Sequence, residues 1–342
     1  MQSFGSKGEL HDHRMLTSIL NWLKSRHYIG ERVGTRQTGG SCFWPKDSLR
    51  KQFKNFNLGS LLRIDTSPLV VLKDKDKKTI SPTPKSRTAN YYAQKLVEIN
   101  SMYDEHRFAC KLLATDCIDG FKPRLKAVFN DSNWSHGGRL YASATKIGFN
   151  YQCIPSDMRK SIIIDGMPTV EVDYSGMHPH LLYARLGKSL SGNVYDFLPC
   201  EDKPLAKFAL LVMLNAKSKQ AAIGALMKRL NDLRLASGLS PKKDALRKAL
   251  LRNSEFEEIV DKAAKRHAEI RSFFYRGTGI RLQNIESLIA LDIVHHFCIQ
   301  NIPVLPVHDS FIIPKQHRKQ LSCEMLKVYK RHANGFSCPI KQ

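Results

Sequence analysis

The sequence has few of the features that mark zinc-binding, membrane-spanning and secreted proteins. Its eight cysteines are scattered, with no C-x-x-C pair and no Cys/His group at zinc-finger spacing, so no zinc site is expected. It contains no uncharged apolar run of about 18 residues, the length that a transmembrane helix requires. Residues 1–14 lack the apolar core of a signal peptide. We therefore expect a globular, cytoplasmic and nucleoid-associated protein with no membrane partner.

Negative charge is also scarce. The chain of 342 residues has 31 Asp and Glu against 54 Lys and Arg, which gives a formal net charge of +23. This excess is larger than solubility requires and indicates a polyanionic partner. Contacts from Lys and Arg to phosphates release counterions, so nucleic acid is the partner that the charge favours. A ribosomal or membrane-surface protein is the alternative, although no basic amphipathic helix with an aromatic face marks a membrane binder.

The order of sequence patterns predicts an α+β protein. The helical patterns cover residues 12–24, 88–113 and 178–290, and the strand patterns cover residues 138–143, 160–174 and 301–314. The second strand pattern contains an Asp165-Gly166 turn, which is typical of a β-hairpin, and the third is interrupted at His308-Asp309. We divide the chain into a helix-rich region, residues 1–130, and a second region, residues 131–342.

Two aspartates stand out because both lie beside apolar strand patterns. Asp173 follows Val170-Glu171-Val172, and Asp309 lies between Val307 and Phe311-Ile312-Ile313. An ionised carboxylate in such a place is costly unless a cation or hydrogen bonds compensate for the lost water. Two carboxylates on adjacent strands are able to hold two Mg²⁺ ions about 4 Å apart. Two ordinary aspartates at hairpin turns are the alternative that the spacing leaves open.

The motifs around these aspartates resemble, in order, those of the family A DNA polymerases and of the single-subunit RNA polymerases of phages and mitochondria. Asp173-Tyr174-Ser175 resembles the first polymerase motif, whose aspartate binds both metals. His308-Asp309-Ser310 resembles the third motif in its RNA polymerase form. Between them, Lys203, Lys207 and Asn215 have the spacing of the basic residue, lysine and tyrosine of the fingers helix.

The resemblance implies a right-hand polymerase fold. It would comprise an antiparallel palm sheet, helical fingers over about residues 185–280, and a small helix-rich thumb or template-binding region within residues 1–130. It also implies two Mg²⁺ ions, with Mn²⁺ as a possible substitute, bound by Asp173 and Asp309. Family A DNA polymerases often carry a proofreading exonuclease, but residues 1–172 contain no Asp-x-Glu of such a site.

The resemblance also assigns roles to the fingers residues. Lys207 would contact the triphosphate and protonate the leaving pyrophosphate, and Lys203 would support the same phosphates. An ordinary surface lysine is the alternative for Lys207. Asn215 departs from the family's tyrosine and cannot stack beneath the incoming nucleotide in the same way. Tyr174 is expected beside the substrate.

Two further segments resemble parts of the same families. Gly138-Arg139-Leu140, with Ile154 to Arg159, resembles the strand and Pro-containing turn that lead into the palm. Arg281 to Asp292 resembles the helix that touches the primer–template minor groove. The resemblance places Arg159 on the nucleotide and the following residues on nucleic acid: Arg139, Arg281, Gln283 and His308. For Asp292 we expect a helix-surface or capping role.

His178 bears on the choice of sugar. It follows Asp173 by five residues, where the family A DNA polymerases have a bulky glutamate and the RNA polymerases have glycine. A bulky side chain there favours deoxynucleotides by steric exclusion. There are two alternatives. His178 is an ordinary residue at a helix N-terminus ahead of Pro179, or its imidazole hydrogen-bonds a 2′-hydroxyl.

These patterns together predict a template-directed nucleotidyltransferase that acts on primer–template and nucleoside triphosphates, as a small exonuclease-free DNA polymerase. Such enzymes are typical of phages and mobile elements. A small RNA polymerase or primase is the nearest alternative. The second alternative is a nucleic-acid-binding protein with a degenerate polymerase fold, which the departure at Asn215 favours and the two retained aspartates oppose.

Overall fold

A computed structural model describes residues 13–32, 42–52, 68–81, 84, 86–111, 117–143, 150–236 and 253–341. Residues 237–252, the end of a basic stretch that begins at Lys217, lie outside them. The chain forms two compact units, Met1–Ile64 with Ala236–Gly238, and Asp65–Leu235 with Leu239–Gln342. Within the described part, none of the helices is long and apolar enough to cross a membrane.

The first unit contains two helices and a β-hairpin. Its described elements are α1 (His13–Ser25), β1 (Ile29–Arg32), β2 (Cys42–Pro45) and α2 (Asp47–Gln52). The strands pair antiparallel, with Ile29 opposite Pro45. The helix predicted over residues 12–24 is confirmed by α1.

An antiparallel sheet forms the centre of the second unit. Its strands are β4 (Phe108–Lys111), β5 (Cys117–Phe121), β8 (Ile162–Ile164), β9 (Met167–Tyr174), β10 (Leu305–Val307), β11 (Ser310–Pro314) and β12 (Ile340–Lys341). They follow the order β10-β11-β9-β8-β4-β5, and β12 also pairs with β9. The predicted hairpins over residues 160–174 and 301–314 are both confirmed, as β8–β9 and β10–β11.

A smaller sheet has the order β3-β6-β7, formed by β3 (Val70–Leu72), β6 (Leu125–Asn130) and β7 (Asn133–Ala142). Strand β7 covers residues 138–142 of the strand predicted over residues 138–143. It lies against helix α10 (Gly279–Cys298). The two come close at Gly138, which has a φ of +85°. A Cβ atom there would lie 2.8 Å from Ser287 Oγ, so the crossing requires glycine.

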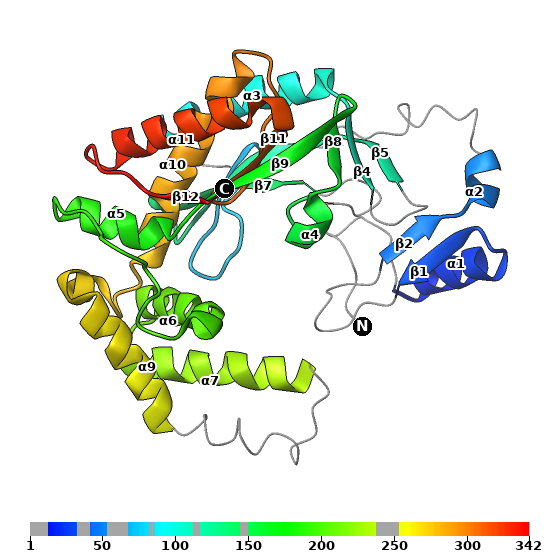
Figure 1. The fold of residues 1–342 in the computed structure, drawn as a ribbon. Helices are drawn as coiled ribbons and strands as arrows, with labels where there is room; N and C mark the ends of the chain where they lie inside the picture. The colour runs from blue at the N-terminus through cyan, green and yellow to red at the C-terminus, as the bar shows by residue number, and fades with distance from the viewer. Residues whose placement is uncertain are drawn as a thin grey trace. The chain divides into compact units, whose positions relative to one another are not determined.

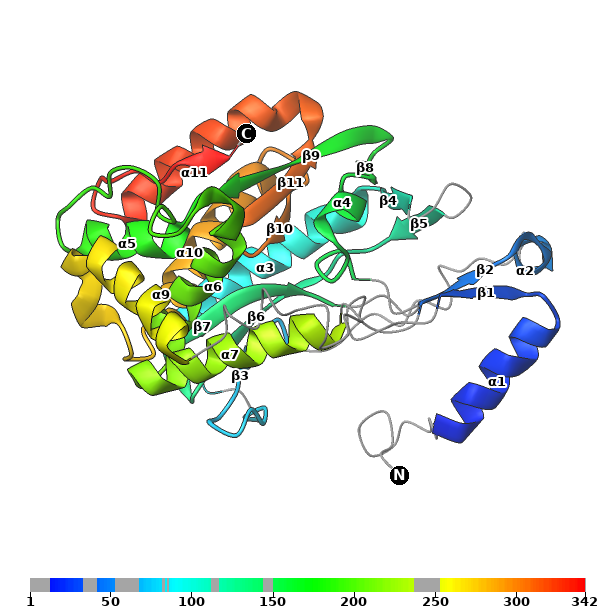
Figure 2. The ribbon, with the colours of Figure 1, turned by 60° about the horizontal axis from the view of Figure 1, so that its bottom comes forward.

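Helices surround these sheets (Figure 1). They are α3 (Arg87–Glu105), α4 (Ser156–Arg159), α5 (Met177–Arg185), α6 (Lys203–Asn215), α7 (Lys219–Ala236), α9 (Asn253–Arg266), α10 and α11 (Arg318–His332), with short 3₁₀ turns at Cys200–Asp202, Ala268–Phe273 and Lys315–His317. Helix α10 packs against α3, α5 and α11. Figure 2 shows α6, α7 and α9 grouped together. The helical content predicted for residues 178–290 is confirmed in the described parts of that range, residues 178–236 and 253–290.

Two details differ from the sequence prediction. The helix expected over residues 88–113 ends at Glu105, and residues 108–111 form β4, because Phe108 and Cys110 alternate into the core. The compact units divide at Ile64–Asp65, not near residue 130. Helix α3 and the strands that follow it share one core with the later elements, as when Tyr103 donates a hydrogen bond to the carbonyl of Val304.

Asp292 joins three helices through hydrogen bonds and is not the helix-surface or capping acid that the sequence suggested. It lies on α10 with 9% of its surface exposed. Its carboxylate binds Tyr91 (2.7 Å) and Lys95 (2.6 Å) of α3 and His332 (2.8 Å) of α11. Burial acts to raise the pKa of Asp292, but these partners outweigh it and hold the pKa far below its ordinary value.

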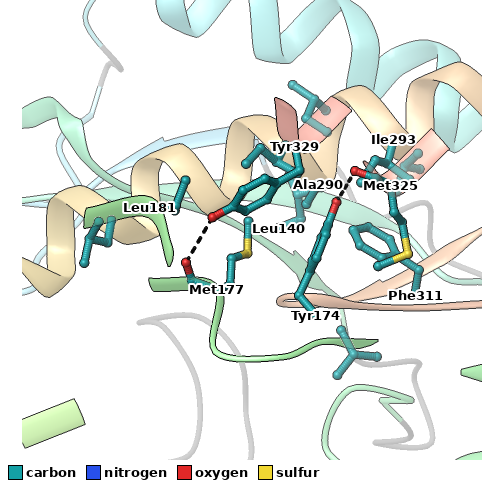
Figure 3. Packing of buried hydrophobic residues seen from close by; sticks show 14 of the residues in the cluster. Leu140, Tyr174, Met177, Leu181, Ala290, Ile293, Phe311, Met325 and Tyr329 are labelled. Carbon is teal, nitrogen blue, oxygen red and sulfur yellow. Dashed lines mark hydrogen bonds between the residues drawn. The ribbon is translucent and has the colours of Figure 1, made fainter. Parts of the chain in front are cut away.

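The main core lies between the central sheet and α5, α10 and α11 (Figure 3). Tyr174 and Tyr329 pack against each other there, with their ring centroids 5.4 Å apart. Tyr174 donates its hydroxyl to the carbonyl of Met325 (2.6 Å), and Tyr329 to that of Met177 (3.4 Å). A buried tyrosine needs such a partner for its hydroxyl group. The first bond ties the end of β9 to helix α11, and the second ties α11 to the start of α5.

Candidate functional site

Asp173 and Asp309 lie at the same end of neighbouring strands. Ser310, the first residue of β11, pairs with Asp173 of β9. Asp309 immediately precedes Ser310, in the two-residue turn that joins β10 to β11. The turn begins at His308, which has a φ of +59°. The amide of Tyr174 donates to the carbonyl of Asp309 (3.3 Å), so the backbones on which the two carboxylates stand are joined directly.

The carboxylate of Asp309 lacks a neutralising partner. Among the described residues, no other side chain donates a hydrogen bond to it or forms an ion pair with it. Burial, followed by the negative charges of Glu286 and Asp173, raises the pKa of Asp309 to about 6. Such a carboxylate would be stabilised by any cation that reached it.

Asp173 carries a cation of the protein's own. The ammonium group of Lys341 forms an ion pair with its carboxylate. Lys341 belongs to β12 and pairs with Asp173 in the sheet. Since Ser310 occupies one edge of β9 at this position, Lys341 pairs along the other edge. Both side chains remain partly exposed, with 41% of Lys341 and 33% of Asp173 accessible.

Lys207 lies within range of both aspartates. It is on α6, and burial first and then the charge of Lys341 lower its pKa. The charges of Asp173 and Asp309 act to raise the pKa of Lys207, whereas the charge of Lys203 lowers it further. The Lys207 ammonium lies 5.6 Å from the centre of the Tyr195 ring. Burial and then the charges of Asp309 and Asp173 raise the pKa of Tyr195 to about 12, so this ring also lies close to the acidic pair.

A buried glutamate forms the inner side of the site. Glu286, on α10, is 3% exposed. Its carboxylate binds Arg139 of β7 through Nε (2.8 Å) and Nη2 (2.9 Å) and His178 of α5 through Nε2 (2.7 Å). Burial acts to raise the pKa of Glu286, but His178 and Arg139 outweigh it and lower the pKa to about 2. The charge of Glu286 contributes to the raised pKa of Asp309, which indicates that Glu286 and its partners lie close to the aspartate pair.

The other predicted residues take different positions. Tyr174 is 1% exposed and points into the core, because alternate residues of a strand face opposite sides. A substrate contact by Tyr174 is therefore not expected. Arg159 forms two hydrogen bonds to Glu171 (2.9 and 2.7 Å), and Glu171 also accepts one from Ser310 (2.6 Å). This arrangement gives Arg159 a role in holding β9 and β11 together.

His308, Asn215 and the two polar residues at the start of α10 complete the predicted set. Nδ1 of His308 is buried without a hydrogen-bond partner among the described residues, and burial lowers the pKa of this imidazole. The amide of Asn215 donates to the carbonyl of Leu211 (2.7 Å) and lies against Gly279. Arg281 is exposed and Gln283 is half-buried.

Three residues at the site were not predicted from the sequence, namely Tyr195, Glu286 and Lys341. Glu286 follows Gln283 by three residues in a segment already singled out, and an acid among the apolar residues of a helix is a signal that could have revealed it. No sequence pattern indicated that Lys341 belongs to the site, because its position beside Asp173 depends on the pairing of β12 with β9. Tyr195 lies between α5 and α6 without a pattern.

The chemistry of the aspartate pair suits Mg²⁺. Carboxylate oxygens are hard ligands, and Mg²⁺ is usually held by one or two of them together with water and substrate phosphates. Within the described ranges, no three or more His, Cys, Asp or Glu side chains are placed to hold a metal ion. The pair alone would therefore share the ion with substrate. The Lys341 ammonium already occupies a cation position on Asp173.

No protein-family model matches the sequence, and no curated protein matches it. Among solved structures, the chain is similar to the POL domain of Pol1 from M. smegmatis, in a complex with DNA primer-template and dNTP. The identity is 11%, the TM-score is 0.38, and the match covers 85% of this chain and 59% of that chain. The chain thus spans less than two thirds of that polymerase domain. A likeness at this level carries no functional argument, and the geometry of the site has to supply one.

Proposed function

We propose that this protein is a template-directed nucleotidyltransferase with two-metal chemistry, and that it makes DNA in preference to RNA. The observation that carries the proposal is the pairing of Ser310 with Asp173, which puts Asp309 and Asp173 at one end of adjacent strands. The order of the polymerase-like motifs and the charge of +23 support the same conclusion.

In this proposal the two aspartates hold the metal ions and the lysines of α6 hold the triphosphate. The chemistry that bound Mg²⁺ supplies is activation of the primer 3′-hydroxyl and neutralisation of the leaving pyrophosphate. The 3′-hydroxyl releases its proton to solvent water, and its oxygen forms a bond to the α-phosphorus as the bond from that phosphorus to the bridging oxygen of pyrophosphate breaks. Lys207 binds the triphosphate and donates a proton to the pyrophosphate, and its lowered pKa assists this transfer.

The remaining residues position the substrates. Lys203 precedes Lys207 by one helical turn and adds positive charge for the same phosphates. Tyr195 lies beneath the Lys207 ammonium and restricts its movement. His178 faces the sugar of the incoming nucleotide and excludes a 2′-hydroxyl. Arg281 and Gln283, on α10, contact the primer–template.

Primer extension tests the proposal. The purified protein, Mg²⁺ and a labelled primer–template are incubated with deoxynucleotides or with ribonucleotides, and primer-free reactions run in parallel. Extension with deoxynucleotides is the expected result, and Asp173→Asn or Asp309→Asn should remove it while salt-dependent DNA binding remains. Asp165→Asn is the matched control, because Asp165 lies in the other hairpin turn of the sheet and binds His106 (2.6 Å).

The outcomes separate the competing functions. Ribonucleotide products, above all without a primer, would assign an RNA polymerase or primase. Salt-dependent binding without synthesis in any reaction would favour the nucleic-acid-binding protein, whose support is the asparagine at position 215. Synthesis retained by the Asp309→Asn protein would contradict the metal assignment.

A further inference from the structure

Glu286 connects three segments that are far apart in the sequence. Its carboxylate joins α10 to Arg139 of β7 and to His178 of α5. Oε1 accepts from Nε of Arg139, and Oε2 accepts from both Nη2 of Arg139 and Nε2 of His178. A charge this deeply buried is tolerated only where hydrogen bonds satisfy it, and here three do so.

The protonation of Glu286 determines which nitrogen of His178 carries hydrogen. The pKa of about 2 keeps Glu286 ionised at neutral pH, and an ionised carboxylate only accepts hydrogen bonds. Nε2 of His178 is therefore the donor. Nδ1 forms no hydrogen bond within the described part of the chain. The imidazole is thus fixed in orientation from one side by a partner that cannot rotate away.

The hydrogen bond between His178 and Glu286 lies close to the two aspartates, which distinguishes it from an ordinary internal ion pair. His178 follows the carboxylate of Asp173 by five residues, at the start of the helix after β9. The same Glu286 charge acts on Asp309. A side chain that excludes a hydroxyl group must resist displacement, and an imidazole without a hydrogen-bond partner is able to change rotamer. The hydrogen bond to Glu286 removes that freedom.

We infer that Glu286 is a positioning residue for sugar selection: it holds the His178 ring against the sugar of the incoming nucleotide, and this sets the preference for deoxynucleotides. The inference rests on the proposed polymerase function. Glu286 itself touches neither the substrate nor the reacting atoms in this arrangement. It acts through His178, and Arg139 keeps its carboxylate in place.

Single-nucleotide incorporation tests the inference. The measured quantity is kcat/KM for a deoxynucleotide divided by kcat/KM for the matching ribonucleotide. A Gln at position 286 offers one oxygen and one NH₂ group, so it cannot accept all three bonds. We expect Glu286→Gln to lower the ratio about tenfold. Glu324→Gln is the matched control, since Glu324 is also buried and pairs with a histidine, His296 (3.5 Å), on α10. It should leave the ratio unchanged.

A double-mutant comparison distinguishes positioning from general loss of structure. In a His178→Ala background, Glu286→Gln should have no further effect on the ratio, because the ring through which it acts is gone. Imidazole ¹⁵N NMR of the wild-type protein should show hydrogen on Nε2 of His178. If Glu286→Gln does not fold, Glu286→Asp keeps the charge with a shorter reach and serves in its place.

Each outcome has a definite meaning. An unchanged ratio in a folded Glu286 variant, or an equal fall with and without His178, overturns the inference and leaves the polymerase function intact. If the wild-type protein extends primers with neither nucleotide, the proposed function fails, and the role in sugar selection fails with it.

Discussion

The ammonium group of Lys341 pairs with the carboxylate of Asp173 across the adjoining strands β12 and β9. The same carboxylate is the one that the proposed function assigns to Mg²⁺. If Mg²⁺ binds there, Lys341 and the metal ion compete for Asp173, and entry of the metal requires the ammonium group to move. The nearby triphosphate of a bound nucleotide would give that ammonium a new partner beside Lys207, whose pKa Lys341 already affects.

Replacing Lys341 with Met should strengthen metal binding. A half-exposed ion pair contributes little, so we expect Mn²⁺ to bind about three- to fivefold more tightly. Calorimetric titration of Mn²⁺ into the nucleotide-free complex with primer–template measures the change. Lys327→Met, which removes an exposed lysine paired with Glu324 (3.6 Å), should leave the affinity unchanged. Weaker Mn²⁺ binding to the Lys341→Met protein would show that Lys341 assists the metal.

Asp309→Asn should stabilise the metal-free protein while it removes activity. The pKa of Asp309 in the folded protein, about 6, lies above its ordinary value of 3.8, so ionisation costs stability as the pH rises through this interval. We expect the variant to gain about 1 to 2 kcal/mol in the free energy of unfolding at pH 7.5. Below about pH 4 both side chains are neutral and the difference should vanish. Urea denaturation in the presence of EDTA at both pH values checks this, and a constant difference would disprove the assignment.

Arg159→Met should affect stability more than nucleotide binding. The guanidinium group binds Glu171, which also accepts from Ser310, so its loss leaves a partly buried carboxylate without its main partner. We expect a loss of about 2 to 3 kcal/mol in the free energy of unfolding. The KM for nucleotide should change less than about twofold. A large rise in KM without destabilisation would contradict this structural role and support the contact between Arg159 and the nucleotide that the sequence suggested.

Asp292→Asn should loosen the packing of α10 against α3 and α11. The carboxylate accepts from Tyr91, Lys95 and His332, and the amide cannot accept all of these bonds. We expect a loss of about 2 to 4 kcal/mol at pH 7. Since the folded pKa of Asp292 is depressed, the contribution is present above its ordinary value of 3.8 and falls as the pH drops below it. Thermal denaturation of both proteins at pH 7 and pH 3 should show a smaller difference at pH 3.

The sequence predicted local features of the fold well. The two hairpins and the positions of Asp173 and Asp309 at their ends depend on alternation and turn residues a few positions apart. The same alternation could have placed Tyr174 in the core, since it follows Asp173 and must face the other side of β9.

What depends on long-range packing could not be predicted. Glu286 meets Arg139 and His178 only because α10 crosses β7 and α5, and no local pattern encodes that crossing. For the same reason Asp292 was expected at a surface that α3 and α11 in fact cover. The division of the chain at Ile64–Asp65 likewise follows from which helices share a core, not from a change in composition.

The pairing of β12 with β9 also bears on the order in which the protein folds. The bond from Lys341 to Asp173 spans 168 residues of sequence, so it is among the slowest contacts to find by chain diffusion. During synthesis on the ribosome, Asp173 emerges long before its partner strand. A nascent chain with β8, β9 and α5 already folded would still expose both edges of β9 at this aspartate, because β11 and β12 come later in the chain. Full protection of the Asp173 region from hydrogen exchange should therefore come late, after docking of β12.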